Sequence, residues 1–431
     1  MQKNEKGLVW FRNDLRVNDN ASLSNAILEN KSVIAIYCFD PRQFEMSKYG
    51  FKKTEKFRAK FNIESVKELK QNLNKLNISL LVFHKKPEEI IPEIVNIHQV
   101  NTIYYQEEWT KDELMVSDNL ISKTKIGVNF KTVYDQFLFH PKDIPFDVDN
   151  IPNVFTQFRN KCEKLSKIRL EIKNENKLSD DNLITNTTEI PTLTDLGFED
   201  FITDSRSAFP FMGGENQAMK RLENYFWETE NLSEYKVTRN GLVGTNYSSK
   251  FSAWLANGSI SAKTIYWQIC DYEKQVEKND STYWLIFELI WRDYFKYISM
   301  KYGEKIFKIG GILDKDYDWK TNKNQIENWI NGKTQEPFVN ANMIELKNTG
   351  FMSNRGRQNV GSFFAKNLFL DWRIGAAYFE SLLIDYDVHS NYGNWMYVSG
   401  VGNDPRDRKF NIQMQSQNYD PDYKYQDLWL K

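Results

Sequence analysis

The sequence has few of the residues that build disulfide frameworks or metal sites. Its 431 residues include three cysteines, Cys38, Cys162 and Cys270, which lie far apart and form no CxxC pair. Its four histidines are scattered and have no metal-ligand spacing. The lack of paired cysteines and of metal-ligand spacing argues against a disulfide framework and a zinc site, and it favours a reducing compartment. We therefore expect a cytoplasmic protein without a metal centre.

Long apolar runs and a strong net charge are missing as well. No stretch approaches the ~18 consecutive apolar residues that mark a membrane span, and the first residues, MQKNEKG, have no signal-peptide pattern. We therefore expect no membrane association. The formal net charge is −1, so any contact with nucleic acid must come from a local patch.

Aromatic residues, in contrast, are plentiful. The chain contains 29 Phe, 22 Tyr and 12 Trp. A well-filled core accounts for most of them, and a flat conjugated ligand is a second use that such a number allows. Composition alone does not separate these two uses.

The first third of the chain alternates between strand-like and helical patterns. The clearest helical pattern covers residues 54–77, where Val66, Leu69, Leu73 and Leu76 recur at spacings of 3, 4 and 3. Strands separated by helices predict a doubly wound parallel sheet with ligand crevices at the carboxyl ends of its strands. No GxGxxG motif follows the first run, so a nicotinamide site is not supported. The strand-like runs are residues 7–12, 32–40, 79–84, 100–106 and 127–134.

The rest of the chain has a different pattern. Residues 136–204 contain several prolines and a polar run, which are typical of a long connection across the surface. After residue 205, helical segments follow one another. We therefore predict an α/β domain over residues 1–135, an inter-domain linker over 136–204 and an all-α domain over 205–431. The predicted helices cover residues 215–232, 249–257, 260–278, 282–302, 323–331, 340–348, 355–369 and 371–385.

Three groups of residues indicate chemistry, and the first is the segment NYSSKFS at residues 246–252. Ser248 can cap the start of a helix, and Gly258 can end it. Hydroxyl groups, a lysine and free backbone N–H groups at the start of a helix also form a cradle for phosphate. Plain helix capping and phosphate binding are both open at this point.

The second group lies in the aromatic segment 283–302. Trp284, Glu288 and Trp291 occupy one face of the predicted helix, with Arg292 beside them. A glutamate in such an apolar helix is costly to bury unless it is paired or faces a polar ligand. An internal Glu288–Arg292 ion pair is one interpretation, and a site glutamate between indole rings is the other.

The third group lies between residues 349 and 408. Asn354 and Gln358 share a helical face, and Arg357 stands next to them. Asp385 and Asp387 then precede an asparagine and several aromatic residues in what we expect to be a glycine-containing loop. A two-carboxylate hydrolase site is an alternative, but carboxylates two residues apart in one loop seldom straddle a substrate. We therefore favour the orientation of a ligand.

Together these motifs resemble the photolyase/cryptochrome family, and in detail its DASH cryptochromes. The resemblance runs nearly from end to end and is weakest between residues 165 and 200. It implies an N-terminal photolyase-type α/β antenna domain and a C-terminal helical domain that binds FAD. The segments that carry it are WFRNDLR at 10–16, YCFDPRQF at 37–44, FELIWRDYF at 287–295, VGNDPRDR at 401–408 and the whole of 349–429, which is similar to the flavin-binding core.

The resemblance implies a set of FAD ligands. Arg357 and Asp385 would form a buried pair against the flavin ring. Asp387 would hydrogen-bond the pyrimidine edge of the ring, and Asn391 would face N5. An asparagine at this last position matches photolyases and DASH proteins, whereas plant photoreceptor cryptochromes have an aspartate. The residues expected to contact the diphosphate arm are Tyr235, Ser248, Ser249, Lys250, Phe251 and Ser252.

The resemblance also implies an electron relay and an antenna. Trp395, Trp372 and Trp319 match the three tryptophans that carry electrons from the surface to photoexcited flavin, and each can serve as core as well. An antenna of methenyltetrahydrofolate is typical of the family. Glu113, in the stretch QEEWTKDEL, is its suggested ligand.

A lesion pocket is the last part that the resemblance implies. Duplex-active bacterial photolyases are similar to this chain but have Trp in place of Tyr397 and Met in place of Gln358. These two differences make the pocket more polar and favour single-stranded DNA. The residues that match the pocket are Glu288, Trp291, Asn354, Gln358 and Tyr397.

The implied activity is that of a deoxyribodipyrimidine photolyase, a carbon–carbon lyase. Such an enzyme uses blue light to repair cyclobutane pyrimidine dimers, here in single-stranded DNA. In this family reduced FAD, excited directly or through the antenna, gives an electron to the dimer and regains it once both bonds have split. We expect a monomer whose partner is single-stranded DNA carrying such dimers.

Three alternatives are open. The first is a blue-light photoreceptor, although the sequence ends at Lys431, directly after YQDLWL, and we expect no extension that could serve as a signalling tail. The second is a (6-4) photolyase, whose histidine pair would stand where Asn354 and Gln358 are. The third is a structural flavoprotein without catalysis. The Asn–Gln pair disfavours the second alternative.

Overall fold

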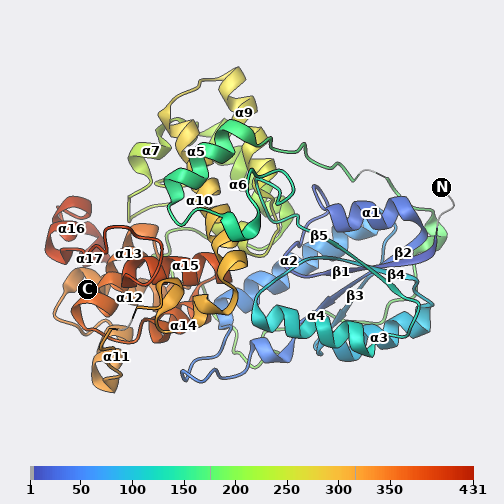
Figure 1. Ribbon diagram of the computed structural model, residues 1–431, viewed down its shortest axis with the longest axis horizontal. Helices are drawn as coiled ribbons and strands as arrows, with labels where there is room; N and C mark the ends of the chain where they lie inside the picture. The colour runs from blue at the N-terminus through green and yellow to red at the C-terminus, as the bar shows by residue number, and fades with distance from the viewer. Residues whose placement is uncertain (1–3, 175, 316) are drawn as a thin grey trace.

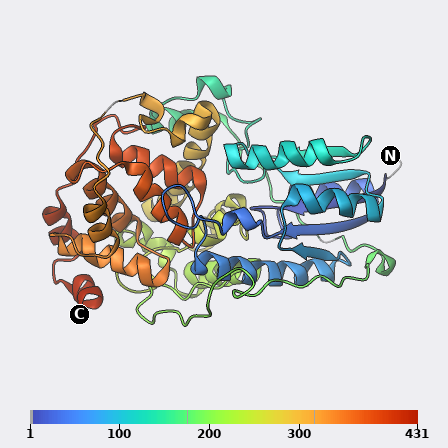
Figure 2. The same cartoon turned by 90° about the horizontal axis from the view of Figure 1, so that it is seen from below.

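The computed structural model describes residues 4–174, 176–315 and 317–431, which form two domains side by side (Figure 1). Residues 1–3 of the predicted first domain, Glu175 of the predicted linker and Asp316 of the predicted all-α domain lie outside the described residues. Figure 2 shows the sheet domain in blue and cyan and the helical domain mainly in yellow to red. In these described ranges no helix is long and apolar enough to cross a membrane, and no group of three or more His, Cys, Asp or Glu could hold a metal.

A parallel sheet organises the first domain. In the described residues it has five strands in the order β3-β2-β1-β4-β5, and every neighbouring pair is parallel. Residues 8–11 of β1 are at most 3% exposed, because a central parallel strand is covered on both faces. All five strands coincide with the strand-like runs, which confirms the predicted α/β class. They are β1 (Asn4–Phe11), β2 (Asn30–Cys38), β3 (Leu80–Phe83), β4 (Thr102–Gln106) and β5 (Asn129–Val133).

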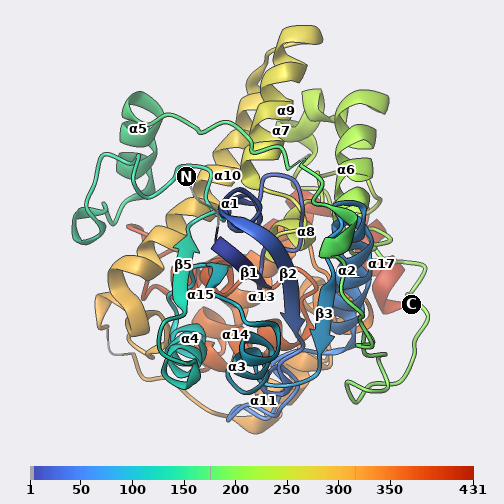
Figure 3. The same cartoon turned by 90° about the vertical axis from the view of Figure 1, so that its right-hand side faces the viewer.

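Helices cover both faces of this sheet. Side chains of α1 (Ala21–Glu29) and α2 (Lys56–Lys75) share one apolar cluster with β1. Side chains of α3 (Pro87–His98) and α4 (Lys111–Lys123) share another cluster on the opposite face. Figure 3 shows the strands side by side, with α3 and α4 below them. The strand order reverses between β1 and β4, so the carboxyl ends of these strands open onto a crevice.

The predicted linker contacts both domains. It contains α5 (Phe155–Leu165), whose Phe158 and Cys162 belong to the apolar core of the helical domain. Further along, Asn182 exchanges two hydrogen bonds of 2.9 Å with the backbone of Val33 in β2. The domain boundaries at residues 135 and 204 stay predictions.

The second domain is built from helices, as predicted. Its central helix α10 begins with a capping box, in which the Asn279 side chain accepts hydrogen bonds from the N–H groups of Ser281 and Thr282. The helices are α6 (Glu215–Glu223), α7 (Tyr235–Thr238), α8 (Ser252–Ala256), α9 (Ala262–Gln275), α10 (Asp280–Tyr302), α11 (Lys323–Ile330), α12 (Pro337–Thr349), α13 (Asn354–Ser362), α14 (Trp372–Leu382), α15 (Val388–Ser399), α16 (Ile412–Tyr419) and α17 (Lys424–Leu430).

The expected glycine-containing loop after Asp387 is wrong. Residues 388–399 form the helix α15, with Asp387 as its N-cap and Gly400 at its end. A Cβ at Gly393 would lie 2.3 Å from the Phe295 ring of α10. Gly393 therefore allows two helices to approach closely and does not mark a turn.

The expected cap at Ser248 is also wrong. Helix α8 begins at Ser252 with Phe251 as its N-cap. Arg221 binds the carbonyl groups of Ser248 and Ser249, which holds this segment in a loop. Gly258, in contrast, follows the helix with a φ of +73°, as a helix-ending glycine should.

The loop after β1 joins the two domains. The Leu15 N–H group donates to Asn257 O at 3.2 Å, and the Arg16 guanidinium donates to Gly258 O at 2.9 Å. A Cβ at Gly258 would lie 2.0 Å from the Asn13 carbonyl oxygen, so only glycine fits at this contact.

Helix α6 completes the interface with this loop. The Glu215 carboxylate accepts hydrogen bonds of 2.9 Å from the backbone N–H groups of Val17 and Asn18. Residues 13–18 of the first domain thus obtain part of their backbone hydrogen bonding from residues about two hundred positions later.

Candidate functional site

A small cavity of about 70 Å³ lies inside the helical domain, between α13 and α15. We call it the helical cavity. It brings together residues that were predicted separately to bind the flavin, to bind the lesion and to relay electrons. The predicted residues that line it are Arg357, Asp385, Asp387, Asn391, Asn354, Gln358 and Trp395.

An ion pair between the partly buried Arg357 and the buried Asp385 forms one wall of the helical cavity. The Arg357 guanidinium donates to both oxygens of Asp385, at 3.0 and 2.8 Å, and the Asp385 side chain is 2% exposed. The Arg357 Nε donates to Met352 O at 2.9 Å, which fixes the guanidinium plane. The predicted pair is present, and its contact with the flavin ring stays a prediction.

Asp387 faces the same cavity from the start of α15. Its Oδ1 accepts from the Ser390 N–H group at 2.8 Å, and its Oδ2 accepts from Lys296 Nζ at 2.8 Å. Burial by itself would raise the pKa of Asp387, but the Lys296 ammonium, together with Arg292, brings that pKa well below its usual range. Asp387 is therefore an ionised carboxylate that lines the helical cavity.

Asn391 and Trp395, one turn apart on α15, lie against α14. Asn391 Nδ2 donates to Ala376 O at 3.0 Å. A Cβ at Gly375 would lie 2.2 Å from the Trp395 ring, so the ring lies directly on the backbone of α14. Trp395 is 2% exposed. Helix α14 thus fixes both side chains at the cavity wall.

The other predicted relay residues lie along the start of α14. Trp372, the first residue of α14, is fully buried, and Trp319 is partly buried. A bridge between Lys320 and Leu370 lays the segment of Trp319 beside the start of this helix. Trp329, which the sequence did not indicate, also contacts the Trp395 ring, with 6.2 Å between ring centroids.

The segment predicted to hold the diphosphate forms a loop before α8. Arg221 of α6 donates to Ser249 O at 3.0 Å and to Ser248 O at 3.1 Å, and so fixes the backbone of this loop. The sequence did not indicate Arg221, because only its contacts identify it. Of the other predicted contacts, Tyr235 and Phe251 are buried and Ser252 is exposed.

Lys250 is the unusual residue of this loop. It is 3% exposed, and its ammonium has no hydrogen-bond partner among the described residues. The ammonium lies 3.0 Å from the centroid of the Tyr247 ring, and burial lowers the pKa of Lys250 well below its ordinary value. A lysine buried in this way keeps its charge only beside an anion. The loop therefore fits the diphosphate of FAD.

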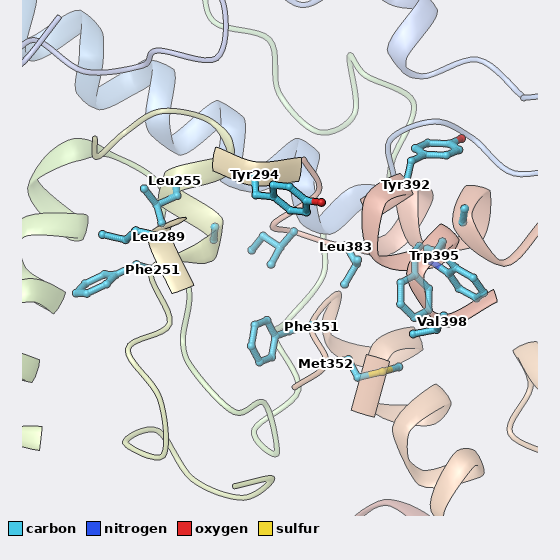
Figure 4. Close-up of a cluster of buried hydrophobic side chains, with 14 of the residues drawn as sticks. Phe251, Leu255, Leu289, Tyr294, Phe351, Met352, Leu383, Tyr392, Trp395 and Val398 are labelled. Carbon is cyan, nitrogen blue, oxygen red and sulfur yellow. The ribbon is translucent and has the colours of Figure 1, made fainter. Parts of the chain in front are cut away.

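Apolar side chains connect this loop with the helical cavity. The Phe351 ring lies 5.1 Å from the Lys250 ammonium and 5.5 Å from the Arg357 guanidinium. Figure 4 shows the surrounding apolar side chains, which come from α8 and the residue before it, from α10, from the segment before α13, from the end of α14 and from α15. The loop and the cavity thus border one apolar region.

The predicted lesion residue Glu288 is paired, but not with Arg292. Its Oε1 accepts from Arg239 at 2.5 Å, and its side chain is 27% exposed. Arg292 donates instead to the carbonyl oxygens of Gln136 and Leu255, so the internal Glu288–Arg292 pair is wrong. Burial raises the pKa of Glu288, and the Arg239 guanidinium opposes this shift.

Trp291 and Tyr397 meet edge to face, with ring centroids 6.1 Å apart. Phe155 of α5 stacks on Trp291 at 3.6 Å, and Arg408 donates to the Tyr397 hydroxyl at 2.5 Å. The structure therefore brings these two predicted residues together and holds each with a neighbour.

Polar contacts link the remaining lesion residues. The Arg355 guanidinium donates to Gln358 Oε1 and to Asn240 Oδ1, both at 2.9 Å. Asn240 directly follows Arg239, the partner of Glu288. Asn354, at the start of α13, is exposed.

A second cavity of about 380 Å³ lies between the domains, at the crevice where the strand order reverses. We call it the interdomain cavity. Glu113 of α4 lines it, as does Glu108, which is 6% exposed and accepts from Gln106 Nε2 at 3.1 Å. Glu108 was not predicted, although its position just after β4 was a usable signal. From the helical domain, Arg292, Lys296, Tyr386 and Asp387 line the same space.

Family models agree with this architecture. Residues 7–176 match the model described as DNA photolyase, and residues 284–431 match the FAD binding domain of DNA photolyase. The fold and the site therefore define a photolyase-type protein with an FAD-binding domain.

Relatives narrow the assignment. A cryptochrome DASH of Gloeobacter violaceus is 48% identical over 425 residues, which cover 98% of this chain and 85% of that protein. A cryptochrome DASH of Synechocystis sp. is 47% identical over 428 residues, with 98% and 87% covered. The crystal structure of the Synechocystis sp. cryptochrome matches with a TM-score of 0.95 and 46% identity, covering 100% of this chain and 89% of that one. The chain belongs to the cryptochrome DASH group of the photolyase/cryptochrome family.

Proposed function

We propose that the protein uses blue light and FAD to repair cyclobutane pyrimidine dimers in single-stranded DNA. The observation that carries this proposal is the shared cavity. Asn354 and Gln358, which match a lesion pocket, line the same space as Asn391, which matches the residue facing flavin N5. A photoreceptor needs a flavin site, but it does not need lesion-binding side chains beside that site. The activity would be that of a deoxyribodipyrimidine photolyase.

Fixed charges prepare the flavin side of the helical cavity. The Arg357–Asp385 pair would lie against the ring, and Asp387 would accept a hydrogen bond from its pyrimidine edge. Asn391 would present its amide group to N5. Reduced FAD bound there would supply the light-driven electron donor. The side chains around it would hold cofactor and lesion in a productive orientation and exclude water.

Helix α10 would supply the lesion contacts. The Glu288 carboxyl would hydrogen-bond a thymine edge and stabilise the negative charge that develops there. Trp291, supported by Phe155, would provide a stacking surface for a base.

The proposed preference for single strands follows from comparing the free energy of flipping the lesion out of a duplex with the free energy gained by stacking it in the pocket. Flipping a damaged pair out of a duplex costs a few kcal/mol, and one base stacked on an aromatic ring recovers about 1–3 kcal/mol. Tyr397 offers a smaller ring than tryptophan, and its hydroxyl is bound to Arg408. Gln358 adds a further polar group, bound to Arg355. A flexible single strand has little of the flipping cost to overcome.

We also propose that the interdomain cavity binds methenyltetrahydrofolate as an antenna. A pteridine edge carries N–H donors that pair with carboxylates. Glu108 is more deeply buried than Glu113 and is held by a hydrogen bond from Gln106, so we propose Glu108 as the main ligand and Glu113 as a second one. We further propose that the protein is cytoplasmic and monomeric. Light scattering of the purified protein would measure its molar mass and so test the monomeric state.

The deciding experiment is a repair assay. The purified, reduced protein is illuminated with blue light in the presence of an oligonucleotide that carries one dimer, either single-stranded or in a duplex, with dark samples as controls. We expect efficient repair of the single strand and weak repair of the duplex. A protein that binds FAD but repairs neither substrate would overturn the proposal and favour a photoreceptor.

A further inference from the structure

The helical cavity and the interdomain cavity share a wall. Tyr386 and Asp387 line both of them. Lys296 of α10 lines the interdomain cavity, and its ammonium donates to Asp387 Oδ2 at 2.8 Å. The Lys296 side chain is 4% exposed. A lysine is rarely buried to this extent unless it is paired, so this contact requires an explanation.

The contact joins the two helices that carry the site. Asp387 is the N-cap of α15, which carries Asn391 and Trp395 into the helical cavity. Lys296 lies on α10, two turns after Glu288. The ion pair therefore connects the predicted flavin helix with the predicted lesion helix at one point.

We propose that Lys296 is a positioning residue for FAD, whose ammonium keeps the Asp387 carboxylate ionised and directed toward the helical cavity. This inference rests on FAD binding in that cavity and does not depend on repair of DNA. Lys296 would act through Asp387 and would not need to touch the cofactor.

Other charged groups lie near Asp387, but among the described residues none of them donates a hydrogen bond to its carboxylate as Lys296 does. Arg292 of α10 is held by two backbone carbonyl groups. His389 of α15 shares a 2.6 Å hydrogen bond with Ser299, and burial lowers the pKa of His389 well below its usual value, so the ring is neutral. Among the described residues, Lys296 is thus the cation in direct contact with the Asp387 side chain.

Charges from the first domain do not take over this role. Glu108, after β4, faces Lys296 and Arg292 and carries the opposite sign. Arg58 of α2 lies 4.8 Å from the centroid of the Tyr386 ring and donates to backbone carbonyl groups. Loss of the Lys296 ammonium would therefore remove the cation that is hydrogen-bonded to Asp387 and leave Arg292, which does not contact the carboxylate directly, as the remaining positive charge nearby.

The test measures how fast FAD leaves the holoprotein, as recovery of flavin fluorescence after dilution. In Lys296→Met at neutral pH we expect release roughly 10- to 100-fold faster than in the wild type, the size of one lost hydrogen bond to a charged group. Lys296→Arg keeps the charge and should restore most of the retention. Lys301→Met is the matched control on the same helix, because Lys301 binds Ile151 O and lines neither cavity.

A pH series separates ionisation from packing. In the wild type the release rate should stay constant between about pH 8 and pH 5, because the folded pKa of Asp387 lies below its usual value of about 4. In Lys296→Met burial is opposed only by Arg292, which has no direct hydrogen bond to Asp387, so the pKa of Asp387 should rise and FAD should be released faster as the pH falls. Asp387→Asn should release FAD quickly at every pH.

Unchanged release in Lys296→Met, or fast release with no dependence on pH, would overturn the proposal. If Lys296→Met does not fold, Lys296→Gln, which keeps a polar side chain without the charge, is measured in the same pH series against the wild type with the same expected result. A wild-type protein that holds no FAD at all would instead refute the premise of the site.

Discussion

The helical cavity and the interdomain cavity differ in how their residues reach them. The helical cavity is lined by α13, by α15, by Phe379 of α14 and by the residues that join α14 to α15. The interdomain cavity is lined by the ends of strands in one domain and by α10 and the start of α15 in the other. Its geometry therefore depends on how two domains meet, whereas the helical cavity depends on neighbouring helices of one domain.

This difference predicts different consequences of mutation. A change in the helical cavity should affect retention of FAD, reduction of FAD or repair itself. A change in the interdomain cavity away from its shared wall should affect light capture and leave the chemistry intact. The predictions below test this division, from the largest expected effect to the smallest.

The largest effect is expected from Asp385→Ala. The wild type should purify yellow with non-covalent FAD, and this variant should not. Removing Asp385 leaves the partly buried Arg357 guanidinium without its partner and takes away one wall of the predicted flavin site. Absorbance of the purified protein measures the retained FAD. Glu113→Ala, in the interdomain cavity, is the control and should stay yellow. An Asp385→Ala protein that is also yellow would contradict the assignment of FAD retention to the helical cavity.

Trp395→Phe should slow or abolish photoreduction of oxidised flavin. Trp395 lines the helical cavity and is the expected proximal member of the relay. Absorbance during illumination with a reductant measures the rate. Trp329→Phe is a close control, because Trp329 contacts the Trp395 ring but lies outside the predicted relay. Chemically reduced Trp395→Phe should still repair the dimer. A normal rate of photoreduction in this variant would mean that Trp395 serves only in core packing.

Glu288→Ala should lower the repair yield by roughly 10- to 100-fold while FAD stays bound, the size of one lost charged hydrogen bond. The carboxyl should touch the lesion and not the cofactor. Repair yield and FAD content are measured on the same preparation. Arg239→Ala removes the partner of Glu288 but keeps the Glu288 carboxyl. It therefore separates the role of this carboxyl at the lesion from its role in the ion pair. Equal loss of FAD in Glu288→Ala would make the Glu288–Arg239 pair structural.

Repair of the same dimer should be about tenfold or more faster in single-stranded than in duplex DNA, because of the flipping cost. The double variant Tyr397→Trp with Gln358→Met should narrow this ratio by enlarging the stacking surface. Both rates must be measured at one salt concentration, since DNA affinity depends on salt. Equal wild-type rates would refute the interpretation of Tyr397 and Gln358.

The smallest effect concerns the antenna. Burial, and after it the like charge of Glu108, raises the pKa of Glu113 to about 7. A folate held mainly by an ionised Glu113 would be lost as the pH falls through this value. Folate absorbance of Glu108→Gln and Glu113→Gln after gel filtration distinguishes the two ligands. Repair under saturating light should be unchanged in both variants.

The sequence predicted those strands and helices whose hydrophobic pattern lies within the segment itself. The strands of the first domain are short apolar runs bounded by polar residues, and all five were found. Helix α15 was missed because Gly393 suggested a turn, whereas its missing side chain makes room for Phe295. The role of this glycine depends on a residue of another helix, and no pattern within the segment reveals it.

Partners distant in sequence were missed for the same reason. Glu288 pairs with Arg239, 49 residues away, and not with Arg292, which stands one helical turn away. Lys296 and Asp387 are 91 residues apart. Such pairs have no periodicity, so residue types alone do not indicate them. The resemblance to a family, in contrast, identified the side chains of the helical cavity, because those side chains lie within its motifs.

The loop after β1 has a consequence for the order of folding during synthesis. Residues 13–18 leave the ribosome early, but the groups that satisfy them, Glu215 and the backbone at Asn257 and Gly258, follow about two hundred residues later. Until then several N–H groups of this loop have only water as a partner. We therefore expect the sheet to form early while its carboxyl edge stays mobile. That edge should become rigid only when the helical domain docks, so the crevice above β1 and β4 would be the last part of the first domain to mature.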